Sequence, residues 1–246
     1  MSVAAPRGII HGVGIGPGDP ELMSVRADRL VRTARTVAYF RKAGRPGQAR
    51  RIVDGMLADG AVELAMEYPT TTEIPFSDPG YNTLLSQFYA ECTADLRALV
   101  HRGEDVVVLC EGDPFFYGSF MHLYIRLKDE VRVTVVPSIT GMSAAWTATG
   151  LPITWGDDVL TVLMGTLPED ALVTHLARSD AVVVMKIGRN IEKVRRALRA
   201  TGRFDDAWLI EFASMDCQTV QHLSDAGGRI TPYFSIIVVH GHGRRP

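Results

Sequence analysis

The sequence predicts an α/β protein of two domains, the first built on a parallel sheet and the second on a mixed sheet. Two observations predict this fold: short apolar runs alternate with helix-patterned stretches along the chain, and fewer helices separate the runs in the second half. A chain of 246 residues that is 46% hydrophobic is also long enough to form two cores. We expect domains at residues 1–151 and 156–246, with a linker at residues 151–154.

Five runs in the first half are expected to be strands, because each is short, mostly rich in β-branched residues and bounded by turn formers. They are residues 9–13, 37–40, 62–66, 106–110 and 131–136. Residues 79–100 carry apolar side chains at three- and four-residue spacing, which predicts a long amphipathic helix. Strands and helices in this alternation imply parallel pairing with right-handed crossovers.

Four runs in the second half are also expected to be strands: residues 159–164, 181–187, 208–212 and 234–239. Residues 190–200 are expected to form a helix, with Asn190 as its N-cap and Gly202 just beyond its end. Because these strands outnumber the helices between them, we expect a mixed sheet in this half.

Charge and composition exclude several classes of protein. A net charge of −2, from 26 basic and 28 acidic residues, gives no global attraction for nucleic acid. The three cysteines are too few and too scattered for a disulfide framework, and no spacing indicates a metal site. The first residues lack the pattern of a secretory signal, and no apolar run approaches the roughly 20 residues that span a bilayer. We therefore expect a cytoplasmic protein.

A glycine-rich loop follows the first expected strand. Gly14, Gly16 and Gly18 let the backbone turn tightly and approach another group closely, and Asp19 is a candidate N-cap for the next helix. A dinucleotide-binding fingerprint would place glycine where Asp19 stands, and a carboxylate there would repel a pyrophosphate. The absence of G-K-[ST] excludes a Walker loop.

The sequence CEGDPFFYGSF, residues 110–120, follows the fourth expected strand. Glu111 and Asp113 flank Gly112, and three aromatic residues come directly after them. Carboxylates and aromatic faces suit a small ligand with hydroxyl groups or a positive centre. A simple Gly-Asp-Pro turn with aromatic residues in the core is the structural alternative.

A third loop follows the fifth expected strand. Pro137 ends that strand, and Thr140 is placed to cap the next helix. Small residues then allow a neighbouring element or a ligand to approach this helix closely: Gly141, Ser143, Ala144, Ala145 and Ala148. Close helix packing alone would explain the same residues.

Together, these loops in this order and at these intervals resemble those of the tetrapyrrole methylases, which are S-adenosylmethionine-dependent enzymes that methylate corrin and sirohaem precursors. The resemblance covers essentially the whole chain. It implies a tetrapyrrole methylase-like pair of α/β domains, a homodimer, and cofactor and substrate in the cleft between the domains. Within the family, CEGDPFFYGSF and the later TPYFSIIVV are similar to members that act on precorrin-2. That similarity implies methylation at C20, giving precorrin-3A in cobalamin biosynthesis.

Two family motifs carry the expected cofactor contacts. The family's G-G-D-P-x-x-x-G appears at residues 111–118 with glutamate as its first residue, and P-G-x-[ST] appears at residues 137–140 with serine in place of glycine. In the second domain, VVVMKIG and the segment near residue 212 match family segments that contact the cofactor. The resemblance implies these cofactor-binding residues: Glu111, Gly112, Asp113, Phe116, Tyr117, Thr140, Gly141, Met185, Phe212 and Ala213.

Substrate contacts are expected from Pro17 in the first loop and from Arg50 and Arg51. Because precorrin-2 is a polycarboxylate, it needs fixed positive charge, and these arginines belong to the densest basic cluster of the chain. Solvated surface charge would explain the same cluster.

The resemblance implies an activated methyl donor, so alignment of the reactants and exclusion of water are expected to provide most of the catalysis. No catalytic residue is assigned, although the proton that C20 must lose makes a base useful. The candidates are Glu111, Asp113, Tyr117 and His122. Four alternatives stay open: cobalt-loaded precorrin-2 as substrate, another tetrapyrrole, methylation of a macromolecule, and non-catalytic binding of a tetrapyrrole or S-adenosylmethionine.

Overall fold

A computed structural model describes residues 8–69 and 79–245, and their contacts divide the chain into two compact units between Thr140 and Gly141. This division lies ahead of the domain boundary expected near residue 152. The difference has a physical cause in α5 (Gly141–Ala148), whose Ala145 is fully buried against Val183 and Ile210 of the second sheet. The first unit therefore ends where α5 begins.

The first unit contains a sheet of parallel strands in the order β3-β2-β4-β1-β5. Its strands are β1 (Ile9–Gly14), β2 (Thr36–Lys42), β3 (Val62–Tyr68), β4 (Val106–Cys110) and β5 (Arg132–Val136). The parallel sheet expected from the sequence is confirmed, with strand ends that differ by a residue or two. All of β4 is buried, because it lies at the centre of the sheet.

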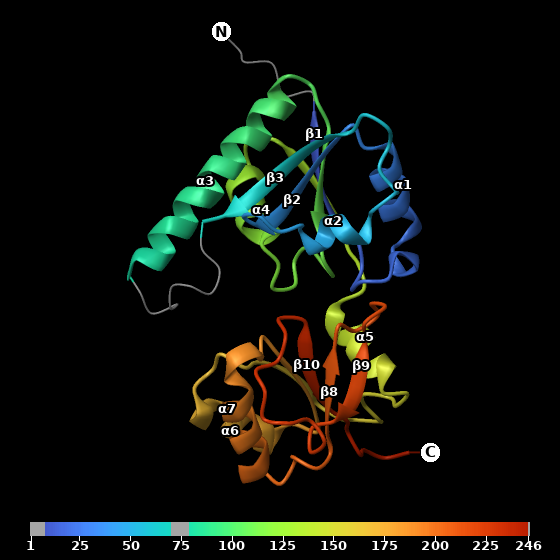
Figure 1. Cartoon of the computed structure of the whole chain (residues 1–246), viewed down its shortest axis with the longest axis vertical. Helices are drawn as coiled ribbons and strands as arrows, with labels where there is room; N and C mark the ends of the chain where they lie inside the picture. Colours follow the sequence, from blue (N-terminus) through green and yellow to red (C-terminus); the bar gives the residue numbers. More distant parts are fainter. Residues whose placement is uncertain (1–7, 70–78, 246) are drawn as a thin grey trace. The chain divides into compact units, whose positions relative to one another are not determined.

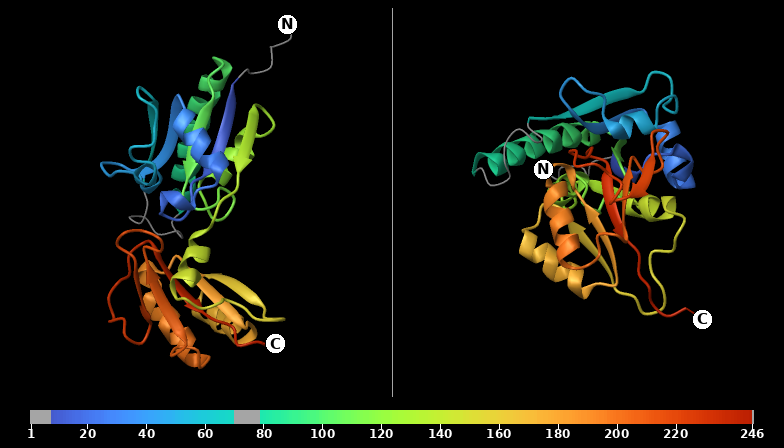
Figure 2. Two further views of the ribbon diagram at one scale, coloured as in Figure 1. Left: turned by 90° about the vertical axis from the view of Figure 1, so that its right-hand side faces the viewer. Right: turned by 60° about the horizontal axis from the view of Figure 1, so that its bottom comes forward.

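Helices cover both faces of this sheet (Figures 1 and 2). On one face lie α1 (Val25–Thr33) and α2 (Gln48–Ile52), and on the other α3 (Pro79–His101) and α4 (Phe120–Leu127). The helix expected at residues 79–100 is confirmed as α3. A Cβ on Gly12 would lie 2.2 Å from the Phe120 ring, so glycine at that position lets α4 pack directly on β1.

The second unit contains a mixed sheet, as expected, in the order β6-β7-β10-β8-β9. Its strands are β6 (Leu160–Met164), β7 (Ala181–Met185), β8 (Ala207–Glu211), β9 (Thr219–His222) and β10 (Ser235–Val239). β6 and β7 are parallel, whereas β10 pairs antiparallel with both β7 and β8. The sequence did not predict β9, because its TVQH has little apolar alternation and the strand lies at an edge of the sheet.

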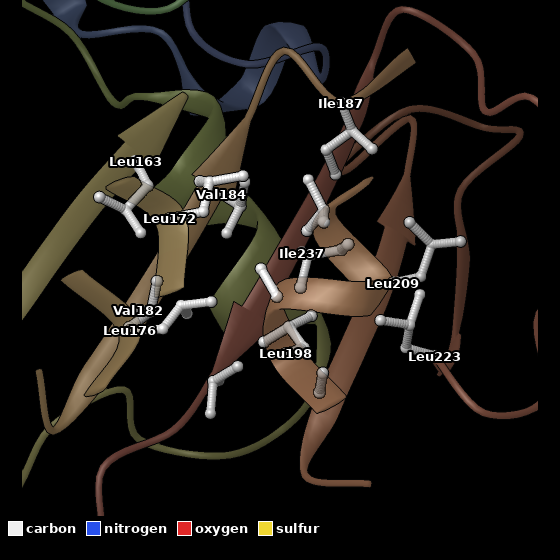
Figure 3. Packing of buried hydrophobic residues seen from close by; sticks show 14 of the residues in the cluster. Leu163, Leu172, Leu176, Val182, Val184, Ile187, Leu198, Leu209, Leu223 and Ile237 are labelled. Carbon is white, nitrogen blue, oxygen red and sulfur yellow. The ribbon is translucent and has the colours of Figure 1, made fainter. Parts of the chain in front are cut away.

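Helices α6 (Glu169–Arg178) and α7 (Ile191–Ala200) cover one face of this second sheet, and α5 packs against the other. Figure 3 shows leucines of both helices, including Leu172 and Leu198, packed against valines and isoleucines of the strands. A 3-10 turn (η2, Gly188–Asn190) precedes α7, so Asn190 occupies the expected N-cap position, but its side chain makes no capping hydrogen bond.

Candidate cofactor and substrate site

The loops after β1 and β4 leave the sheet of the first unit at its topological switch point. These two strands are neighbours, yet the helix that follows β1 lies on one face and the helix that follows β4 lies on the other. Such a point, beyond the carboxyl ends of parallel strands, is where open α/β sheets bind ligands. Two of the loops predicted from the sequence therefore begin at the expected kind of site.

Backbone hydrogen bonds join these two loops. The N–H of Ile15 donates to the Cys110 carbonyl oxygen (3.0 Å), and the N–H of Gly112 donates to the Gly16 carbonyl oxygen (2.8 Å). Both glycines have positive φ, +85° at Gly16 and +61° at Gly112, which L side chains rarely adopt. The loops after β1 and β4 thus meet in an antiparallel backbone bridge between Gly16 and Gly112.

The third loop packs directly beside this bridge. A Cβ on Gly14 would lie 2.5 Å from Cβ of Ser138 and 2.7 Å from the Gly112 carbonyl oxygen. Asp113 connects the loops through both carboxylate oxygens: Oδ1 accepts from the N–H of Phe115 (2.9 Å) and Oδ2 from the N–H of Ser138 (3.0 Å). Asp113 therefore holds the backbone of the site in place, and this use of both oxygens disfavours it as a base.

One polar atom at this junction lacks a partner. Oγ of Ser138 is buried and has no hydrogen-bond partner in the described part of the chain. Buried hydroxyl groups are normally satisfied, so this one suits a contact with a ligand or a water molecule. Serine stands here in place of the family's glycine, and the sequence alone did not indicate a role for it.

The aromatic residues of the second loop are not all in the core. Phe115 and Tyr117 are each 46% exposed, whereas Phe116 is partly buried with its ring 4.8 Å from that of Tyr117. Tyr117 also has a φ of +55°, a conformation that costs free energy in a non-glycine residue and is concentrated at functional sites. This exposure favours a binding loop over a turn with core aromatics.

Within the described residues, positive φ at a non-glycine residue occurs at only three further positions, and all of them are in the second unit. They are Lys186 (φ +52°), Phe212 (φ +53°) and Ser214 (φ +63°). Lys186 directly follows Met185, and the other two flank Ala213. Because β7 and β8 both run antiparallel to β10, the loops that follow these two strands leave the sheet at the same end of the strands. The strained positions therefore include one residue that the motifs predicted, Phe212, and lie next to the other two, Met185 and Ala213.

Met185, Phe212 and Ala213 lie at the ends of these strands. The Met185 carbonyl oxygen accepts from the N–H of Gly165 (2.7 Å), and the N–H of Phe212 donates to the Phe234 carbonyl oxygen (2.8 Å). The side chains of Met185 and Ala213 are partly buried on the face that α5 covers. Thr140 precedes the first residue of α5, Gly141, in agreement with the helix start expected there.

Glu111 carries a carboxyl group whose pKa is shifted by its surroundings. Burial raises the pKa of this group to about 7, and the backbone of Ala49, in α2, opposes part of that rise. Part of the residue is exposed although the carboxyl group is buried. The cofactor contact expected at Glu111 stays a prediction.

The arginines of the basic cluster differ in whether they form ion pairs with acidic side chains. Nε of Arg50 donates to Glu63 (2.8 Å) and Nη1 to Asp54 (3.1 Å), while Arg41 is paired with Glu67 (2.6 Å). Arg51 is exposed and forms no ion pair within the described ranges. A cavity of about 300 Å³ lies among these arginines, Tyr39 and the acidic residues. The structure thus leaves Arg51 available for a substrate carboxylate and commits Arg50 to the protein.

The remaining candidates lie in different surroundings. Pro17 directly follows Gly16, so it lies next to the backbone bridge between the loops after β1 and β4. His122 lies on α4, where its ring stacks on Tyr89 of α3 with centroids 4.5 Å apart.

No group of three or more His, Cys, Asp and Glu side chains in the described residues is placed to hold a metal ion. No helix within residues 8–69 and 79–245 combines the length and apolar character needed to cross a membrane.

A family model described as Tetrapyrrole (Corrin/Porphyrin) Methylases matches residues 10–225. The chain belongs to this family. The match includes both loops of the switch point, the third loop and the strained segments after β7 and β8. The family predicted from the loops is therefore confirmed.

Two curated relatives are similar to this chain over nearly their whole length. A precorrin-2 C(20)-methyltransferase from Sinorhizobium sp is 46% identical over 239 residues, which cover 97% of this chain and 98% of that protein. A cobalt-precorrin-2 C(20)-methyltransferase from Salmonella typhimurium is 25% identical, across 95% of this chain and 96% of that protein. The solved structure of a cobalt precorrin-4 methyltransferase has a TM-score of 0.72 at 22% identity and covers 94% of each chain. This likeness supports the two-unit α/β fold.

Proposed function

We propose that this chain is an S-adenosylmethionine-dependent methyltransferase that transfers one methyl group to C20 of precorrin-2, giving precorrin-3A in cobalamin biosynthesis. The observation that carries the proposal is the 46% identity to a precorrin-2 C(20)-methyltransferase over nearly all of both chains. Cobalt-loaded precorrin-2 is the second candidate substrate, supported by the more distant relative that is named for it.

S-adenosylmethionine supplies a methyl group that its sulfonium centre has already activated. The chain must then bind, orient and desolvate the reactants. Gly16 and Gly112 allow a ligand to approach the backbone closely, and Asp113 holds the loop after β4 against the third loop. The aromatic face of Tyr117 suits a positive sulfur. We also propose cofactor contacts in the second unit, at Met185 and Ala213.

The substrate is a macrocycle with several carboxylates. Exposed guanidinium groups bind carboxylates through paired hydrogen bonds, and Arg51 has this capacity free. Pro17 lies next to the bridge between Gly16 and Gly112, where the macrocycle or the cofactor is expected to bind. We further propose that the protein acts as a homodimer in the cytoplasm, without a resident metal.

Product NMR with a carbon-13 methyl donor tests the proposal. The purified full chain is incubated with S-adenosylmethionine and, separately, with precorrin-2 and its cobalt form. A label at C20 of precorrin-2 is the expected result. Faster turnover of the cobalt form would favour the second candidate. A label at another carbon, or binding of both ligands without turnover, would contradict the proposed reaction.

A further inference from the structure

Glu211, the last residue of β8, carries a buried carboxyl group that uses only one of its two oxygens. The residue is 3% exposed, and its Oε2 accepts from Oγ1 of Thr219 (3.2 Å) and from Nη2 of Arg229 (2.5 Å). Its Oε1 is buried and has no hydrogen-bond partner within residues 8–69 and 79–245. Burial of a carboxylate costs free energy, and an unpaired oxygen adds to that cost. Stability alone therefore does not explain a carboxylate at this position.

The arginine that pairs with this carboxylate belongs to a segment, residues 229–234, that leads into β10. Two hydrogen bonds join this segment to the loops after β7 and β8. Oγ1 of Thr231, which is 5% exposed, donates to the Gly188 carbonyl oxygen (3.3 Å), and the N–H of Phe212 donates to the Phe234 carbonyl oxygen (2.8 Å). The rings of Phe212 and Phe234 also lie 6.3 Å apart between centroids. The segment therefore contacts both of the loops that contain strained backbone.

We propose that Glu211 is a positioning residue that anchors this segment through Arg229. The anchored segment in turn holds the two loops that carry the proposed cofactor contacts, Met185 and Ala213. Each of these contacts lies within three residues of a hydrogen bond to the segment. The arginine side chain is 54% exposed, so its pairing with a buried carboxylate draws a surface segment onto the end of β8. This inference rests on the proposed function for its effect on S-adenosylmethionine, but the anchor itself does not.

Two single substitutions remove the ion pair from opposite sides. Glu211→Gln keeps the volume of the side chain and removes its charge, and the arginine left behind is solvated because more than half of its side chain is exposed. We expect this variant to keep the melting temperature of the parent, since it also removes a buried charge. Arg229→Met leaves the carboxylate buried without its cation, so we expect a lower melting temperature. Both variants should bind the cofactor more weakly, and Glu211→Gln separates that effect from stability.

Calorimetry of the full chain measures the affinity. We expect the Kd of S-adenosylmethionine to rise about five- to tenfold in each variant, and the Kd of its demethylated product, S-adenosylhomocysteine, to rise equally. A direct charge effect predicts a different result, because only the methyl donor carries a sulfonium charge. Loss of the carboxylate would then weaken binding of the donor alone, and loss of the arginine would strengthen it. In the double variant, the second substitution is expected to add no further rise in Kd.

Glu169→Gln provides the matched control. Glu169 of α6 pairs with Arg196 (2.7 Å), so this variant also removes an ion pair of the second unit, outside residues 229–234 and the loops that they contact. We expect its affinity for both ligands to stay within about twofold of the parent. An unchanged Kd in a folded Glu211→Gln protein, tighter binding in Arg229→Met, or an equal loss in the control would each overturn the positioning role.

Hydrogen exchange separates this inference from the proposed function. The amide of Phe212 donates to the anchored segment, so we expect it to exchange faster in Glu211→Gln and Arg229→Met than in the parent and the control, whatever cofactor the protein uses. Exchange at the parent rate in both variants would overturn the anchor. If exchange differs as expected but the parent protein binds no S-adenosylmethionine, the proposed function fails and the anchor stands.

Discussion

At the scale of single residues, the site depends on backbone conformations that few amino acids adopt. Gly112 combines a φ of +61° with a hydrogen bond to Gly16, and it lies where the family motif places a cofactor contact. Gly202 has nearly the same φ, +67°, but follows α7 and has open space where a Cβ would lie. Replacement of either glycine is therefore expected to strain the backbone, but only Gly112 has a proposed role in cofactor binding.

This pair leads to a prediction for cofactor binding. Alanine at either position is expected to cost about 1 kcal/mol of stability, because L residues are strained at positive φ. Only Gly112→Ala, and more strongly Gly112→Leu, should also weaken S-adenosylmethionine binding, by about tenfold or more. Calorimetry and thermal unfolding measure the two effects. Unchanged affinity in a folded Gly112→Leu protein would place the cofactor elsewhere.

A second residue-scale prediction concerns pH. The Glu111 carboxyl has a raised pKa of about 7 in the folded protein, against 4.5 for an ordinary glutamate, chiefly because it is buried. Between these pH values the folded state binds more protons than the unfolded state. The stabilising contribution is therefore complete below about pH 4.5 and is lost as pH rises through 7.

Denaturant unfolding of the parent and of Glu111→Gln across this range measures the effect. Relative to the variant, the parent is expected to lose on the order of 3 kcal/mol between pH 4.5 and 7.5. Other titrating groups are common to both proteins and cancel in the difference. Parallel stability curves would show that folding does not raise the pKa of this carboxyl group.

At the scale of elements, α7 is joined to the chain that follows β9 by one buried side chain. Arg195 is 6% exposed, and its Nη2 donates to the carbonyl oxygens of Leu223 (2.7 Å) and Ala226. Its neighbour Arg196 is exposed and pairs with Glu169 of α6 (2.7 Å). Hydrogen bonds from a buried charged group contribute more to stability than an exposed ion pair does.

Replacement of these arginines tests that difference. We expect Arg195→Met to lower the free energy of unfolding by about 3 kcal/mol, because two buried carbonyl groups lose their donor. Arg196→Met should leave the melting temperature nearly unchanged. Chemical denaturation followed by circular dichroism measures both. Equal effects would mean that solvent replaces the Arg195 hydrogen bonds.

The elements also show what the sequence could predict. Apolar, β-branched runs such as Val106–Cys110 identify strands within a residue or two, because period and composition are local properties. The helix at Gly141–Ala148 was predicted, but its small residues do not indicate which sheet it covers, so the division between the units was placed too late in the chain. The hydrogen bond from the N–H of Ser138 to the Asp113 carboxylate joins distant segments, and no local pattern predicts it.

The candidate site was predictable to a similar extent. The sequence motifs identified the loops. In the structure, hydrogen bonds of Gly16, Gly112 and Asp113 join the loops of the first unit. The positive φ values of Lys186 and Ser214 had no signal in the sequence, because neither residue type favours that conformation. Arg50 and Arg51 looked alike in the sequence, and only the positions of Glu63 and Asp54 distinguish them.

At the scale of the whole molecule, large apolar side chains are exposed at scattered positions in both units. Val62 on the edge strand β3 is 60% exposed, and Ile125 on α4 is 64% exposed. In the second unit, Ile230 and Tyr233 are 73% and 72% exposed. The family resemblance implies a homodimer, and symmetric association would bury some of these groups.

The last prediction is that homodimer, with a mass of about 54 kDa, twice the 26.9 kDa of one chain. Light scattering at low micromolar concentration measures it. Because the net charge is only −2 and the exposed groups named above are mostly apolar, we expect the mass to persist in 1 M salt, which screens ionic contacts but not apolar burial. Dissociation in salt would assign the interface to ion pairs, and a mass near one chain under both conditions would contradict the dimer.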